Sequence, residues 1–302
     1  MTDNKYFDVI IIGGSYAGLS AAMALGRSLR QVLIIDSGLP CNRQTPHSHN
    51  FITHDGDTPK AIAEKAKAQV LNYSSVIFHN GLAVSGKKTG NAFVITTHAG
   101  KSFTGRKLIF ATGIKDVMPD IKGFSECWGI SVIHCPYCHG YEFRNKKTGI
   151  MANGAKALHL ASLVNNLTED ITILTSGKAV FNDEEHAKLG KHHIEIIETK
   201  ISAIEHEKGN IRNIVFDDGS KMSFPAVYAA IAFVQHSDIP VSLGCELNEA
   251  GYIKTDGFQK TTVAGIYACG DNTFMMRSVA AAVYAGNITG ALVNKELTDE
   301  DF

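Results

Sequence analysis

The sequence lacks an excess of charge of either sign, with 29 lysines and arginines against 30 aspartates and glutamates. Proteins that bind nucleic acid or an anionic membrane carry a basic patch or stripe, so neither partner is expected. The apolar run 9–12 is far too short to span a bilayer, and the residues before it lack the layout of an export signal. We therefore expect a cytoplasmic protein with no membrane partner.

Cysteines are also scarce, with six in 302 residues, and four of them stand alone: Cys41, Cys127, Cys245 and Cys269. This excludes the dense disulfide framework of small secreted proteins. Isolated cysteines are most often small buried hydrophobic residues, which is how we interpret these four. The other two, Cys135 and Cys138, form a Cys-x-x-Cys pair within the segment His-Cys-Pro-Tyr-Cys-His-Gly-Tyr-Glu at 134–142.

A Cys-x-x-Cys pair can serve redox chemistry or bind zinc. Two thiols at this spacing can close a small disulfide, and a helix that begins there favours the thiolate, the nucleophile of thiol–disulfide exchange. Zinc requires a second pair of ligands, which the isolated cysteines do not offer. His134 and His139 are too close in sequence to fold back readily into a tetrahedral cage. The pair therefore predicts redox chemistry and no metal site.

The segment 7–36 predicts a βαβ unit, and the length of the chain suggests about two domains. An apolar strand over 9–12 leads into the glycine-rich turn 13–18, and a helix follows. A second strand over 32–35 ends at Asp36. Glycines for a tight turn and an acid for a ribose form a dinucleotide-binding fingerprint, in which Ser15 replaces the middle glycine and is small enough to keep the close approach.

Two later segments predict strands that end in small residues. They are Leu-Ile-Phe-Ala-Thr-Gly at 108–113 and Gly-Ile-Tyr-Ala-Cys-Gly-Asp at 265–271, and a helix over about 276–297 follows the second. Together with the first βαβ unit, they outline a flavin-binding fold that is split across the two ends of the chain.

The middle of the chain predicts a second nucleotide-type unit. Its expected strands cover 148–151, 171–174, 194–197, 211–216 and 227–233, and its first turn, 152–157, leads into a helix. The expected fold is α/β, with two Rossmann-like three-layer domains. Residues 116–236 are expected to be inserted into a domain formed by 1–115 and 237–302.

These features, in this order, resemble the low-molecular-weight thioredoxin reductases over nearly the full length of the chain. The resemblance implies FAD as cofactor and a homodimer. It places the flavin against Gly13, Gly14, Ser15, Ala17, Gly18, Asp36, Asn50, Ala111, Thr112, Gly113, Gly270 and Asp271.

One departure from that family concerns NADPH. The reductases carry Gly-x-Gly-x-x-Ala in the inserted domain and then a His-Arg-Arg run for the 2′-phosphate. Here the first motif becomes Ala152-x-Gly154-x-x-Ala157, and the second becomes Thr-Ser-Gly-Lys at 175–178. A lysine is a poor substitute for bidentate guanidinium, and each lost charge-assisted contact weakens binding by about 1.5–3 kcal/mol. NADPH is therefore a doubtful cofactor, and the altered glycine turn disfavours NADH as well.

A second departure is His139, which stands where typical thioredoxin reductases have an aspartate. The extended motif at 135–142, and the segment 42–56, look more like the dithiol oxidases that act on gliotoxin and holomycin. Those enzymes pass electrons from a dithiol through the cysteine pair and FAD to oxygen without NADPH. This branch of the resemblance implies a dithiol oxidase.

The resemblance also implies roles for the residues of the redox segment. Cys138 would be the flavin-proximal sulfur and Cys135 the sulfur that exchanges with substrate. His139 is the natural acid–base residue because an imidazole has an ordinary pKa of about 6.5. The alternative is that His139 is a helix-end residue without a catalytic part. Glu142 either orients His139 or favours the helix start, and His134 is a reserve candidate for either role.

Other functions remain open at this point. One is a disulfide reductase for thioredoxin, supplied with electrons by NAD(P)H or by reduced ferredoxin. Another is a flavin-bearing redox sensor with little turnover. The substrate dithiol or disulfide is either a small molecule or a thioredoxin-like protein. His47, His49 and His54 are interpreted as polar loop residues near the flavin or the substrate rather than as metal ligands.

Overall fold

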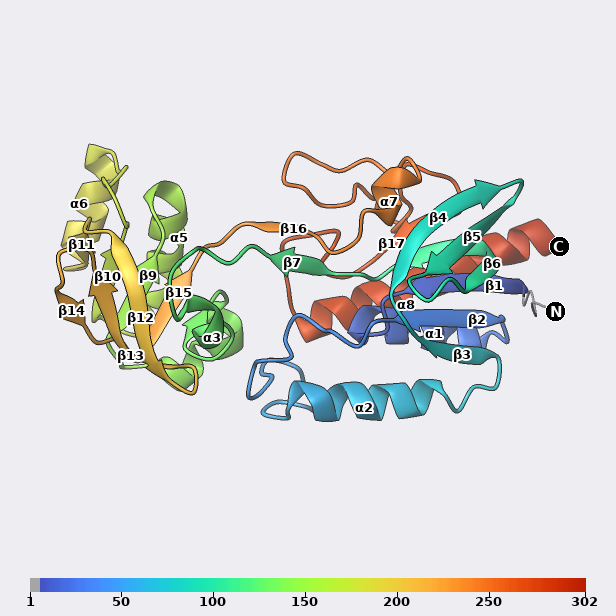
Figure 1. Ribbon diagram of the computed structural model, residues 1–302, viewed down its shortest axis with the longest axis horizontal. Helices are drawn as coiled ribbons and strands as arrows, with labels where there is room; N and C mark the ends of the chain where they lie inside the picture. Colours follow the sequence, from blue (N-terminus) through green and yellow to red (C-terminus); the bar gives the residue numbers. More distant parts are fainter. Residues whose placement is uncertain (1–5) are drawn as a thin grey trace. The chain divides into compact units, whose positions relative to one another are not determined.

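The computed structural model describes residues 6–302. The prediction that the segment before the apolar run is not an export signal rests partly on residues 1–5, which lie outside the described residues. Two compact units are present (Figure 1). The first contains the chain up to residue 43, residues 59–115 and residues 233–302; the second contains residues 44–58 and 116–232. Among residues 6–302, no helix combines the length and apolar character that crossing a membrane requires.

The first unit is built on a seven-stranded sheet in the order β3-β2-β1-β6-β5-β4, and β17 pairs with β6. All pairings are parallel except those that β5 makes with β4 and β6. The strands are β1 (Tyr6–Ile12), β2 (Val32–Asp36), β3 (Val76–Asn80), β4 (Ala83–Thr89), β5 (Ala92–Thr97), β6 (Ser102–Phe110) and β17 (Ile266–Ala268). The helices are α1 (Tyr16–Arg27), α2 (Pro59–Val70), α7 (Ile239–Ser242) and α8 (Val279–Asp301).

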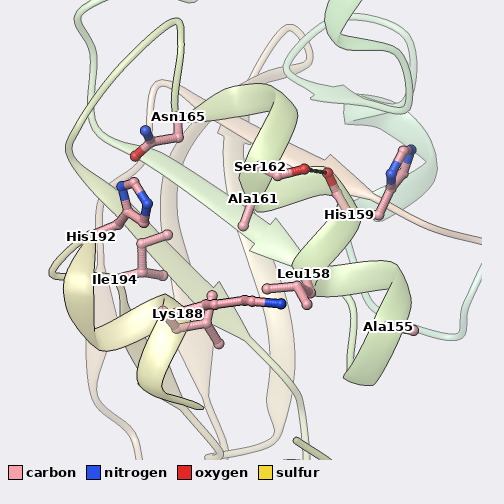
Figure 2. Close-up of a pocket in the computed structure, with 10 residues that line it drawn as sticks. Ala155, Leu158, His159, Ala161, Ser162, Asn165, Lys188, His192 and Ile194 are labelled. Carbon is pink, nitrogen blue, oxygen red and sulfur yellow. Dashed lines mark hydrogen bonds between the residues drawn. The ribbon is translucent and has the colours of Figure 1, made fainter. Parts of the chain in front are cut away.

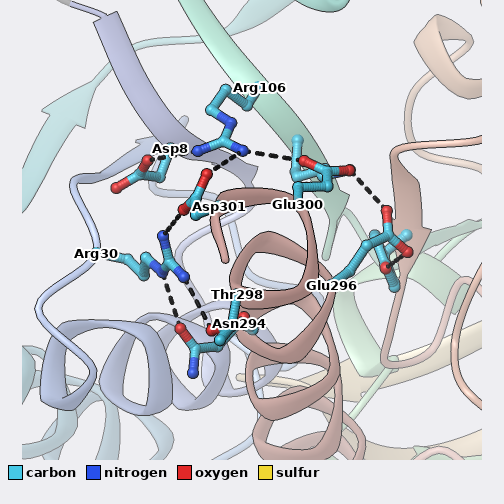
Figure 3. A network of polar contacts seen from close by, with 10 residues as sticks. Asp8, Arg30, Arg106, Asn294, Glu296, Thr298, Glu300 and Asp301 are labelled. Carbon is cyan, nitrogen blue, oxygen red and sulfur yellow. Dashed lines mark hydrogen bonds and ion pairs between the residues drawn. The ribbon is translucent and has the colours of Figure 1, made fainter.

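Within the first unit, helix α8 packs closely against α1 and forms ion pairs with β6. A Cβ atom at Gly286 would overlap the carbonyl oxygen of Ala17, so only glycine lets α8 lie this close to α1. At the other end of α8, Arg106 of β6 contacts Asp301 at 2.7 Å and Glu300 at 3.0 Å (Figure 3). This network holds the C-terminal helix beside the strands that carry the dinucleotide fingerprint.

The second unit combines a parallel sheet with a small antiparallel one. The parallel sheet has the order β11-β10-β9-β15-β8, and the antiparallel sheet has the order β12-β13-β14. The strands are β8 (Val132–Ile133), β9 (Thr148–Met151), β10 (Ile171–Leu174), β11 (Glu195–Ile197), β12 (Ile201–Glu207), β13 (Asn210–Phe216), β14 (Lys221–Met222) and β15 (Ala226–Ala229). The helices are α3 (Phe124–Cys127), α4 (Pro136–His139), the 3₁₀ turn η1 (Tyr141–Phe143), α5 (Gly154–Val164) and α6 (Asp183–Lys191).

The structure corrects two boundaries. The strand expected over 227–233 ends at Ala229, and the chain then forms β16 (Phe233–Gln235), which pairs with β7 (Ile114–Asp116) where the chain passes between units. Segment 44–58, expected in the flavin domain, packs with the second unit instead. There the Gln44 side chain donates a hydrogen bond to the Ser125 carbonyl. Such a long-range contact leaves no trace in the local pattern.

Helices α5 and α6 of the second unit enclose a pocket of about 470 Å³ (Figure 2). Its lining includes the apolar side chains of Leu158 and Ile194 and the polar side chains of Lys188 and His192. The residues expected to carry the function do not belong to its lining, so the pocket is set apart from the sites described next.

Candidate redox and dinucleotide sites

The turn between β1 and α1 leaves a helix N-terminus open. Ser15 precedes the helix, but its side chain makes no capping hydrogen bond, and no acidic residue lies in the first turn, within the described part of the chain. The amide groups at a helix start point outward and carry partial positive charge. An open helix start of this kind is suited to a pyrophosphate.

Asp36 closes the same turn from the end of β2. One of its carboxylate oxygens accepts a hydrogen bond from the Gly14 amide at 2.8 Å, and the other accepts one from the Gly38 amide at 3.0 Å. Each oxygen keeps a lone pair that a ribose hydroxyl can use. A Cβ at Gly13 would overlap the carbonyl oxygen of Ala111, which shows how closely the turn approaches the end of β6.

The C-terminal part of the site contains a residue that the sequence analysis missed. Asn272 is fully buried, and its amide donates hydrogen bonds to the carbonyl of Phe110 at 2.9 Å and to the Thr112 hydroxyl at 3.3 Å. Asn272 therefore ties the segment after β17 to the end of β6. Its Oδ1 atom is buried and has no hydrogen-bond partner among the described residues. The only sequence signal was its position directly after Gly270-Asp271.

These features fit the FAD that the family implies. The first unit brings together the glycine turn, Asp36, the Ala-Thr-Gly end of β6 and the Gly-Asp segment after β17. An open helix start and a buried acceptor without a partner are features that a bound dinucleotide would satisfy. Asn50 is different: it lies in segment 44–58, so the first unit alone does not place it beside the turn.

Cys135 and Cys138 are joined as a disulfide in the second unit, with their Cα atoms 5.3 Å apart. Cys135 caps α4, because its sulfur accepts a hydrogen bond from the Cys138 amide at 3.2 Å. Pro136 occupies the first helical position, where its missing N–H costs nothing. Both cysteines are half-buried, so a substrate thiol can reach the pair.

A cluster of titratable side chains lies beside the disulfide. Burial lowers the pKa of His139, nearby His49 lowers it further, and Glu142 acts in the opposite direction. His49 Nε2 lies 3.7 Å from a Glu142 carboxylate oxygen, and His49 Nδ1 lies 3.6 Å from an Asp55 oxygen. His134, the reserve candidate, stacks on Trp128 with ring centroids 5.8 Å apart. Sequence analysis treated His49 only as a loop residue and missed its contact with Glu142.

The first turn of the second unit is closed by its own side chain. The side-chain oxygen of Asn153, Oδ1, accepts hydrogen bonds from the backbone amide of Gly154 at 2.8 Å and from that of Val180 at 2.9 Å. The side-chain nitrogen of Asn153, Nδ2, donates a hydrogen bond to the Lys178 carbonyl at 2.9 Å. Glu198 accepts a hydrogen bond from the Ala179 amide at 2.6 Å, so a carboxylate also contacts the loop after β10.

Comparisons with known proteins define the class. The family model of the pyridine nucleotide-disulphide oxidoreductases matches residues 7–286, and the chain belongs to that family. The relatives include thioredoxin reductase sirT of Leptosphaeria maculans, 32% identical over 98% of this chain and 95% of that protein. Thioredoxin reductase tcpT of Claviceps purpurea is also 32% identical, over 98% of this chain and 96% of that protein.

Solved structures agree with this assignment. A putative thioredoxin reductase TrxB from Bacillus anthracis has a TM-score of 0.94 at 30% identity, covering 98% of this chain and 100% of that one. HlmI has a TM-score of 0.93 at 29% identity, covering 100% of this chain and 95% of that one. The protein is thus a flavin-dependent disulfide oxidoreductase with a thioredoxin reductase-like fold, and FAD is its cofactor.

Proposed function

We propose that this protein oxidises substrate dithiols through the Cys135–Cys138 disulfide, with FAD as the electron acceptor and no nucleotide in the second unit. The observation that carries the proposal is the contrast between the open start of α1 and the start of α5, which Asn153 and Val180 close. The relatives sirT and tcpT, which are named thioredoxin reductases, support the thiol–disulfide chemistry of this proposal.

The cysteine chemistry balances as a two-electron oxidation. A substrate thiolate attacks the sulfur of Cys135, the disulfide breaks, and Cys138 leaves as a thiolate. The second substrate thiolate then attacks the substrate sulfur of the mixed disulfide, which releases Cys135 and the substrate disulfide. Two protons leave the substrate, and two electrons remain on the cysteine pair. When bound, FAD supplies a two-electron acceptor that restores the disulfide, with oxygen as the final acceptor.

His139 serves as the base that receives the thiol protons. Its pKa lies below the ordinary histidine value because burial disfavours the imidazolium. The side chain is therefore neutral and able to accept a proton at neutral pH. Activity is expected to decline as the pH falls below the ordinary histidine value, when His139 becomes protonated before substrate binds. The substrate is a small dithiol or the dithiol of a thioredoxin-like protein.

The test is anaerobic mixing of dithiothreitol with wild-type protein and with Cys138→Ser. Wild-type flavin is expected to bleach, and the variant is expected to retain yellow FAD that dithiothreitol does not bleach. Cys41→Ser is the matched control, because Cys41 lies outside the pair; it is exposed, whereas the sequence predicted a buried cysteine there. Equal bleaching in wild type and Cys138→Ser would exclude the cysteine pair as the relay.

A further inference from the structure

Segment 44–58 forms a closed loop in the second unit that fixes the direction of His49. The Ser48 amide donates to the Asp57 carbonyl at 2.8 Å, and the Gly56 amide donates to the Ser48 carbonyl at 2.9 Å. Inside this closure, the Asn50 amide donates to an Asp55 carboxylate oxygen at 2.7 Å. Ser48 is buried, so the base of the loop is anchored next to His49.

His49 lies between two carboxylates, of which Asp55 is the more exposed. The His49 side chain is 22% exposed, with Glu142 on its Nε2 side and Asp55 on its Nδ1 side. Glu142 is 38% exposed, whereas Asp55 is 68% exposed and reaches solvent. Both nitrogen–oxygen distances exceed a hydrogen bond by several tenths of an ångström, a gap that small rotations close when a site tightens around substrate.

We propose that Glu142, His49 and Asp55 form the route by which protons taken up at His139 leave the redox site. The inference rests on the proposed dithiol oxidation, because the thiol half of that reaction releases two protons beside a half-buried base, while the reduction of oxygen to hydrogen peroxide takes up two protons in the other half. In each passage His49 gains a proton at Nε2 from the Glu142 side and gives up its Nδ1 proton toward Asp55. Tautomer exchange through water returns the remaining ring proton from Nε2 to Nδ1 before the next passage. No electron moves in this step, and the net charge of His49 is the same before and after it.

The charges around the route support this direction. His139 must lose its first proton before it can accept the second, and Glu142 faces it from the following turn. His47 lies beside His49, with ring centroids 6.4 Å apart, but its Nδ1 contacts the Gly56 carbonyl at 2.9 Å. His49 is thus a positioning and relay residue, since it acts through Glu142 and His139.

The test is steady-state dithiol oxidation by His49→Gln over a range of pH, in a dilute buffer. Glutamine keeps a polar side chain but cannot carry a proton between two sites, so kcat is expected to fall about tenfold or more. Added imidazole, a diffusible proton carrier, is expected to restore most of the loss. The acid limb of the pH profile is expected to move to higher pH in His49→Gln and to lower pH in Glu142→Gln, because these two groups shift the pKa of His139 in opposite directions.

His54→Gln is the matched control within the same loop. His54 contacts Asp57 at 2.8 Å through Nδ1 and stacks on Phe51, so its loss disturbs the loop without touching Glu142. An equal kcat loss in His54→Gln, or a His49→Gln loss that imidazole does not restore, would reduce His49 to a structural role and overturn the relay. Wild-type protein that does not oxidise dithiols at all would instead remove the proposed function.

Discussion

The starts of α1 and α5 occupy equivalent places in two nucleotide-type units, yet they are built in opposite ways. At α1 the carboxylate of Asp36, at the end of β2, accepts a hydrogen bond from the Gly14 amide in the turn, and no side chain caps the first helical turn. At α5 the side-chain oxygen of Asn153, the residue before the helix, accepts hydrogen bonds from the Gly154 amide and from the Val180 amide in the loop after β10. We propose that the same topology provides a dinucleotide site in the first unit and no nucleotide site in the second.

On this proposal, nucleotide binding by a Rossmann-like unit depends on the side chains at its first turn and not on the fold alone. A phosphate at α5 would have to displace the Asn153 side-chain oxygen from two amide donors, whereas the start of α1 has no side-chain cap to displace. The predictions below test whether the two turns differ as described.

The largest expected effect comes from adding one methyl group to each turn. In Gly18→Ala the new Cβ would overlap the Gly13 carbonyl oxygen, whereas in Gly154→Ala the nearest atom is the Val180 carbonyl oxygen at 3.3 Å. Gly18→Ala is expected to lose FAD or fail to fold. Gly154→Ala is expected to cost only about 1–2 kcal/mol, for its left-handed backbone. Flavin content and thermal unfolding of both purified variants provide the comparison, and equal behaviour would contradict it.

A smaller effect is expected for Asp36→Ala, which removes the acceptor for the Gly14 amide and the acid available to a ribose. Loss of a charge-assisted hydrogen bond of about 1.5–3 kcal/mol corresponds to FAD binding weakened by about 10- to 100-fold. Fluorescence titration of apoprotein with FAD measures the change. Asp36→Asn keeps an acceptor oxygen and is expected to lose less; unchanged affinity in Asp36→Ala would place the ribose elsewhere.

Asn153→Ala tests the closed turn directly. Removal of a helix-capping side chain is expected to destabilise the second unit by about 1–2 kcal/mol, measurable by denaturant unfolding. NADPH is still expected not to bind tightly, because the loop 175–178 contains no arginine. Tight NADPH binding by the variant would show that the asparagine was the sole barrier. Tight NADPH binding by the wild-type protein would contradict the closed turn itself.

The smallest effect concerns the network that fastens α8 in the first unit. Although burial favours its neutral acid, hydrogen bonds from Lys107, Lys260 and Tyr267 lower the pKa of Glu296 to about 2. Because the folded pKa is depressed, this stabilisation is present above the ordinary glutamate pKa and is lost as the pH falls from there toward 2. Glu296→Gln is expected to cost about 1 kcal/mol at neutral pH and to flatten stability over that acid range. Thermal unfolding measured against pH tests both expectations. If the pH dependence of stability were the same in Glu296→Gln as in the wild-type protein, the hydrogen bonds to Glu296 would not contribute to stability.

The sequence predicted the fold class and the family because both depend on local patterns. The apolar strands, the glycine turn at 13–18 and the order of the motifs can be read from residues close together in the chain. The closure of α5 could not be read in this way, because Asn153 finds Val180 only after an intervening helix and strand. The contact between His49 and Glu142 joins residues still further apart. Local patterns identify elements, whereas these two features depend on how loops pack.

The most direct test of the central claim is an anaerobic titration of the yellow protein, following its visible flavin absorbance. The account predicts that NADPH and NADH leave the flavin oxidised and that a dithiol bleaches it, with the colour returning when air is admitted. Rapid bleaching by NADPH would contradict the account, because it would require a working nucleotide site at the turn that Asn153 closes.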